Sequence, residues 1–255
     1  MNKILLLILF LLMIYIDRKR GMKLFFSIIM NFTILMIVFY FITLGMNPIV
    51  VSLIGCYIIS YIILYFVNGK NRKTTSSMKS IVIVLVLLAI MIFIMTHISR
   101  IAGFGEEAYE EINMFSYDVN IDFTGISISL ILMSLIGVTV DASIAVSSAL
   151  YEVYDNNKDL TQKELFYSGM NIGRDILCTS VNTLLFAFLG DFMTLVIWFY
   201  QENNAFLEMI NSKTFASECI KILFSGTGCV MIIPITAYIT SKSIKKISLE
   251  EIEET

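Results

Sequence analysis

Long apolar runs alternate with short polar connections along the whole chain. Most runs are close to the roughly 20 residues that a helix needs to cross the hydrocarbon core of a bilayer. The first run is the shortest and reaches about 17 residues only when it is extended to the initial Met. The pattern predicts an all-α polytopic membrane protein with a single transmembrane domain over 1–255 and about seven helices, at about 1–17, 24–44, 48–67, 80–98, 123–150, 172–200 and 219–240.

Two segments between and after these runs are polar. The segment 151–171 is expected to be a cytoplasmic loop with a short amphipathic helix over Asp159–Met170. Its Thr161-Gln162-Lys163-Glu164 has the capping-box pattern, in which the first and last side chains satisfy free amides at a helix start. The residues 241–255 form a charged tail, which is also expected in the cytoplasm.

Basic residues predict the orientation of the helices, because loops rich in Lys and Arg stay in the cytoplasm while acidic residues have little influence. The connections after the first, third, fifth and seventh runs carry most of the 18 Lys and Arg residues. The acidic connection 99–122 is therefore expected outside. The N-terminus is predicted outside and the C-terminus in the cytoplasm.

Composition agrees with this assignment and excludes other classes of protein. The chain is 57% hydrophobic and 15% charged, whereas a soluble domain has about 25% charged residues. The four cysteines form no CxxC pair, so free thiols are expected and a metal site or disulfide framework is not. No cofactor and no nucleic-acid partner are expected. The lipid bilayer is the expected environment.

The fifth run carries the most conspicuous polar residue, Asp141, because an ionisable side chain inside an apolar span is by default a candidate functional residue. Ser127, Ser134 and Ser148 recur at seven-residue spacing with it, and Gly137 and Ala145 lie one turn either side. These positions share one helix face. Close packing explains the serines alone, whereas packing does not require an acid at Asp141.

The sixth run carries a second polar face, formed by Asn171, Asp175, Thr179 and Asn182. Gly169 and Gly173 form a GxxxG spacing, which favours close helix packing. Asn182 is expected at a depth similar to that of Asp141. Arg174 and Asp175 fit either an interfacial pair or a functional role. In the seventh run, Ser225-Gly226-Thr227-Gly228 and Pro234 fit either a kink or the lining of a polar path.

The C-terminal half resembles the YibE/F family of bacterial integral membrane proteins. The resemblance rests on Asp141, the run Ser168-Gly169-Met170-Asn171-Ile172-Gly173-Arg174-Asp175 and the triplet Asn182-Thr183-Leu184. It is closest to the short, YibF-like form, which implies the bacterial cytoplasmic membrane. It also implies a larger YibE-type paralogue as a partner, or a second copy of the chain. The family has no settled biochemical function.

A second resemblance concerns Gly137-Val138-Thr139-Val140-Asp141-Ala142, which is similar to the fourth transmembrane helix of SecD/SecF-type proteins and of the wider resistance–nodulation–division exporters. In those proteins the acid belongs to a proton relay. This chain departs from them in having one set of helices and no large extracellular domain.

These features leave two functions open. The first is a transporter or permease subunit with a proton or cation site at Asp141. The second is a non-catalytic assembly or scaffold factor in which Asp141 pairs with a partner helix. An enzyme is not expected, because neither the GxGD motif of intramembrane aspartyl proteases nor a rhomboid-like GxSG is present.

Overall fold

The computed structural model describes residues 2–99, 123–201 and 206–253, and this part of the chain contains helices and no strand. The helices are α1 (Asn2–Ile16), α2 (Arg18–Thr43), α3 (Pro48–Tyr61), the π-helical η1 (Ile62–Val67), α4 (Arg72–Ser99), α6 (Phe123–Asn156), α7 (Gln162–Gln201), α8 (Phe206–Asn211) and α9 (Lys213–Glu253). The predicted outer connection 99–122 falls almost entirely outside the described residues.

The lengths and composition of the helices confirm the predicted fold class. Six described helices are long and apolar enough to cross a membrane, and the apolar stretch Ile4–Ile16 of α1 is shorter. Many of their large apolar side chains are exposed, as expected for helices that face lipid. The chain is an all-α polytopic membrane protein.

The segment 162–201 differs from the prediction of a short cytoplasmic helix followed by a separate span. The structure has one continuous helix, α7, over both stretches. The predicted capping box is present, since the Thr161 amide donates to Glu164 Oε2 at 2.7 Å and the Glu164 amide donates to Thr161 Oγ1 at 3.3 Å. The cap therefore begins the spanning helix itself. In the same way α9 continues to Glu253 through the predicted tail, and Pro234 lies inside it.

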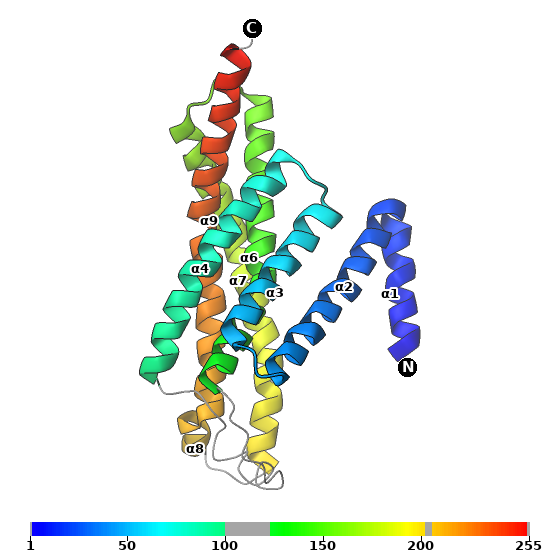
Figure 1. Cartoon of the computed structure of the whole chain (residues 1–255), viewed down its shortest axis with the longest axis vertical. Coiled ribbons are helices and arrows are strands. Elements are labelled where there is room, and N and C mark those ends of the chain that lie inside the picture. The colour runs from blue at the N-terminus through cyan, green and yellow to red at the C-terminus, as the bar shows by residue number, and fades with distance from the viewer. Residues whose placement is uncertain (1, 100–122, 202–205, 254–255) are drawn as a thin grey trace.

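The core lies where α4, α6 and α9 pack together, with α3 against α6 and α7 against both α6 and α9. In Figure 1, α1 and α2 form a hairpin that stands away from this bundle. The residues that cap the start of α3 explain the sharp turn of the chain between α2 and α3. Asn47 Oδ1 accepts from the amides of Ile49 and Val50, and Pro48 follows in the first turn, where a missing amide hydrogen has no effect.

One end of the bundle collects the basic connections, and we call it the basic end (residues 17–23, 68–73, 151–163 and 241–245). Arg20 Nη2 donates to Asn68 Oδ1 at 2.7 Å, and Lys73 Nζ lies 3.9 Å from Glu152 Oε1. Lys245 lies over the Tyr154 ring at 5.9 Å. Figure 1 shows the C-terminus at this end and the N-terminus toward the opposite one. The fold thus brings together the connections that the positive-inside rule assigns to the cytoplasm.

We predict that the basic end faces the cytoplasm, and single cysteines in a cysteine-free background test this. Lys70 and Met46 are exposed at opposite ends of the bundle, so they are suitable positions. In intact cells, a membrane-impermeant thiol reagent should label Met46→Cys and spare Lys70→Cys. The reverse pattern would invert the orientation. Thr74 is unsuitable because it is only 1% exposed.

Candidate functional site

The predicted polar residues of α6 lie on its outward face. Asp141, Ser134 and Gly137 are exposed, whereas Ser127, Ala145 and Ser148 are half-buried. The opposite side of α6 carries its fully buried leucines and packs into the core. We call the six positions the α6 outer face. Asp141 lies near the middle of the helix, and its carboxylate has no hydrogen bond or ion pair within residues 2–99, 123–201 and 206–253.

The predicted polar residues of α7 are also exposed. They are Asn171, Arg174, Asp175, Thr179 and Asn182. Within the described part of the chain, the side-chain hydrogen bonds of this group join Thr179 Oγ1 to its own helix, at the carbonyls of Asp175 and Ile176. The opposite side of α7, with Leu165, Gly169 and Gly173 buried, packs on the bundle. The structure therefore exposes Ser134, Gly137 and Asp141 of α6 and all five of these α7 residues, while the rest of the α6 set is half-buried.

Contacts between α6 and α7 indicate which residues lie at the depth of Asp141. A Cβ built on Gly169 would lie 2.9 Å from Leu150 Cδ1. The two helices run antiparallel, so counting nine residues from this contact along each one pairs Asp141 with Cys178.

A second route, through α9, pairs Asp141 with a residue six positions nearer the start of α7. The Ser143 and Thr236 hydroxyls are 3.1 Å apart, and Ile233 lies against Gly173. Because α6 and α9 run parallel, this route sets Asp141 level with residue 172 of α7. The two routes bracket 172–178, a stretch that includes Arg174 and Asp175. Asn182 lies at least one helical turn, about 6 Å, nearer the other end.

The four glycine and alanine positions predicted for helix packing separate into two groups. A Cβ on Gly169 would lie 2.9 Å from Ala237 Cβ, and one on Gly173 would overlap Ile233 Cγ2. These two glycines permit the close approach of α7 to α9. Gly137 is different, because a Cβ there would meet nothing within 4 Å. Ala145 is half-buried on the α6 outer face.

A buried set of hydroxyls that the sequence analysis missed joins α4, α6 and α9. Ser77 Oγ donates to the Ser143 carbonyl at 3.2 Å, and Ser143 Oγ lies 3.1 Å from Thr236 Oγ1. One turn away, Ser147 Oγ donates to the Lys73 carbonyl at 3.0 Å and accepts from Thr240 Oγ1 at 3.4 Å. We call this set the hydroxyl ladder (Ser77, Ser143, Ser147, Thr236, Thr240). Its sequence signal is the i, i+4 spacing in both α6 and α9.

The hydroxyl ladder satisfies polar groups inside the bundle and binds its helices together, as interhelical serine and threonine bonds do in membranes. Its hydroxyls are neutral, so the ladder has no charge to exchange. Among the predicted site residues, the ionisable side chains are Asp141, Arg174 and Asp175, and all three lie on the exposed faces of α6 and α7. Within the described residues, no group of three or more His, Cys, Asp or Glu side chains is arranged to hold a metal ion.

Comparison with known proteins agrees with the resemblance seen in the C-terminal half and extends it over nearly the whole chain. The family described as YibE/F-like protein matches residues 5–246, which include every helix from α2 to α8 and most of α9. No curated protein and no solved structure matches the chain. The match covers well over half of the sequence, and the chain belongs to the YibE/F-like protein family.

Proposed function

We propose that this chain is a subunit of a transporter or permease in the bacterial cytoplasmic membrane, with Asp141 as its proton or cation site. The observation that carries the proposal is the position of Asp141, which is exposed near the middle of a spanning helix. A charged side chain at mid-bilayer is unfavourable by about 2.5–3.5 kcal/mol on insertion scales. Such residues almost always face protein or a water-filled path, and they mark ion pathways and proton relays.

In this proposal, the surface of a second protein has to cover Asp141, because the carboxylate is exposed on the single chain. Ser134 and Gly137 flank the carboxylate on the same exposed face, and Arg174 and Asp175 of α7 are exposed at its depth. A partner chain that packs against both helices would remove these groups from lipid. We propose that the partner is a larger YibE-type paralogue, or else a second copy of this chain. The similarity of Gly137–Ala142 to SecD-type helices, whose acid serves a proton relay, supports the same function.

The assembly of the complex tests this proposal. Gently solubilised protein, with the paralogue co-expressed, is expected to give a native mass greater than that of one chain. In liposomes, the assembled complex is expected to carry a proton-coupled flux. A single chain under all mild solubilisation conditions contradicts the partner, and a complex without ion flux favours a scaffold or assembly factor over a transporter.

A further inference from the structure

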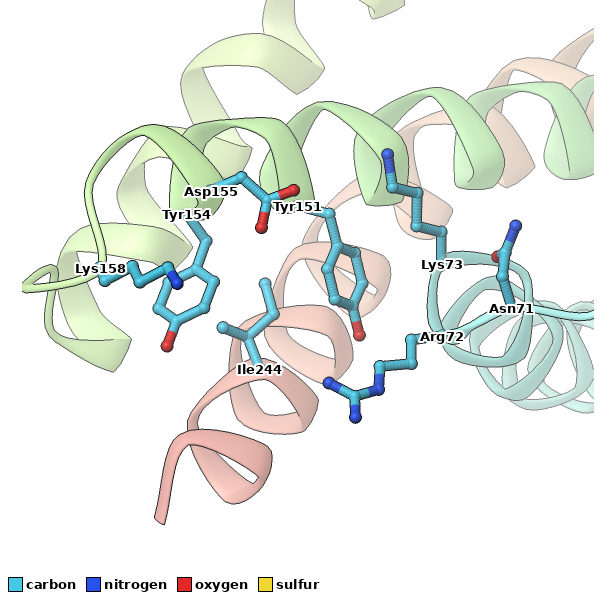
Figure 2. Close-up of a pocket in the computed structure, with 8 residues that line it drawn as sticks. All are labelled: Asn71, Arg72, Lys73, Tyr151, Tyr154, Asp155, Lys158 and Ile244. Atoms are coloured by element: carbon cyan, nitrogen blue, oxygen red, sulfur yellow. The ribbon is translucent and has the colours of Figure 1, made fainter. Parts of the chain in front are cut away.

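A hollow at the basic end lies apart from the α6 and α7 outer faces. Its volume is about 360 Å³, and it is formed by the start of α4, the end of α6 with the turn that follows, and α9 (Figure 2). Its lining residues are Asn71, Arg72, Lys73, Tyr151, Tyr154, Asp155, Lys158 and Ile244. The start of α4 and the end of α6 with its turn thus contribute polar side chains to one concave surface, and α9 contributes the apolar Ile244.

Tyr151 is the least expected residue in this hollow. It is only 8% exposed, and its hydroxyl is buried without a hydrogen-bond partner among the described residues. A buried hydroxyl without a partner is unfavourable by about 1–3 kcal/mol, so native proteins rarely leave one. Figure 2 shows this hydroxyl pointing toward the side of the hollow where the Arg72 guanidinium lies. The arrangement provides a donor for a group that enters the hollow.

The charges of the hollow indicate the sign of that group. Arg72, Lys73 and Lys158 line it against one lining carboxylate, Asp155, and Lys73 is also paired with Glu152 beside the hollow. Arg72 and Lys73 are also the first two residues of α4, where the helix dipole favours an anion. Asn71 Oδ1 accepts from the Thr74 amide at 2.8 Å, which fixes the start of α4 in this position. The lining therefore favours an anion that accepts several hydrogen bonds.

We propose that this hollow binds a phosphate group, with the Tyr151 hydroxyl as a hydrogen-bond donor and Lys158, which lies across the hollow in Figure 2, as a positive charge of the lining. Phosphate has the charge and the number of acceptor oxygens that suit this lining. Two sources supply it at a membrane surface, the headgroup of an anionic phospholipid and a soluble phosphate compound. Basic pockets between transmembrane helices on the cytoplasmic side bind anionic headgroups. The predicted orientation places this hollow on that side. The site is independent of Asp141 and of the transport proposal.

Thermal melting of the purified full-length protein in a zwitterionic detergent tests the site, because a ligand of the folded state raises the melting temperature. The probes are dioctanoyl phosphatidylglycerol, dioctanoyl phosphatidylcholine and inorganic phosphate. Phosphatidylglycerol is expected to raise the melting temperature saturably and more than phosphatidylcholine does. Tyr151→Phe should weaken its apparent affinity by about fivefold, the usual effect of one hydrogen bond. Lys158→Gln should also weaken it, because it removes a positive charge of the lining.

Lys242→Gln is the matched control, since Lys242 is an exposed basic residue of the same end that does not line the hollow. It should bind like the unmodified protein. If inorganic phosphate stabilises the protein with the same dependence on Tyr151 and Lys158, the source is a soluble phosphate compound. If only the anionic lipid does so, the source is the headgroup. Unchanged affinity in both variants, or an equal loss in Lys242→Gln, overturns the site. Lys158 is exposed, so its variant remains informative even where Tyr151→Phe folds poorly.

Discussion

Replacing Asp141 by Asn is expected to abolish transport while leaving expression and assembly nearly intact. Asn retains the size of the side chain and most of its hydrogen bonding, but it cannot exchange a proton or carry a charge. Nothing in the described chain bonds to the carboxylate, so the fold of the single subunit does not depend on it. Flux into liposomes, compared with native mass for the same preparation, separates the two effects.

Two further variants sharpen this test. Asp141→Glu keeps the ionisable group one methylene further out and should retain partial flux. Ser134→Ala changes another exposed residue of the α6 outer face, whose hydroxyl bonds only to the Ile131 carbonyl of its own helix, and should keep full flux. Full flux through the Asp141→Asn variant would contradict a proton relay at this position. Arg174 and Asn182 would then be the next candidates for the site. If Asp141→Asn instead prevents assembly, and flux falls only because less complex forms, the scaffold role is favoured.

Replacing Gly173 by Leu is expected to have the largest effect on stability. Any Cβ at this position overlaps Ile233 Cγ2 of α9, so the larger side chain forces α7 and α9 apart. Overpacking of this kind lowers the free energy of unfolding by about 1–3 kcal/mol, and by more where the neighbouring element has to move. Thermal melting of the purified single subunit measures the change.

Gly137→Leu is the matched control, because it makes the same substitution in a spanning helix where a Cβ meets nothing within 4 Å. It should melt like the unmodified subunit and reduce association with the partner. Equal melting temperatures for Gly173→Leu and the unmodified subunit would contradict the close packing of α7 on α9.

The spanning helices and their caps were predictable because both depend on local chemistry. Apolar length identifies a span regardless of what lies beside it. The Thr161–Glu164 cap needs only residues three apart, and it forms as predicted. The continuity of α7 was not predictable in the same way, because the polar stretch before the sixth run predicts a separate short helix at the membrane surface, whereas the structure joins it to the span. Nothing in 162–172 stops a helix, and Gly169 lies inside α7 at a packed contact.

The side of each helix that faces the core was not predictable from the sequence. In water the apolar face marks the core, but in a membrane both lipid and the protein interior are apolar, so hydrophobic periodicity loses its meaning. The serines spaced with Asp141 drew attention to the α6 outer face. The hydroxyls that actually join the helices, Ser143 and Ser147, lie on the opposite side and are completely buried. Only the positions of α4 and α9 distinguish the two sets.

We expect a second chain to cover the α6 outer face around Asp141, and the collision accessibility of a spin label at Gly137 measures whether it does. Gly137 has room for the label within the single subunit, and Val86 of α4, which is 51% exposed, provides a lipid-facing reference. In the assembled complex in liposomes, the label at Gly137 is expected to collide far less often with dissolved oxygen than the label at Val86. An oxygen accessibility at Gly137 equal to that at Val86 would show that lipid covers this face and would contradict the presence of a second chain there.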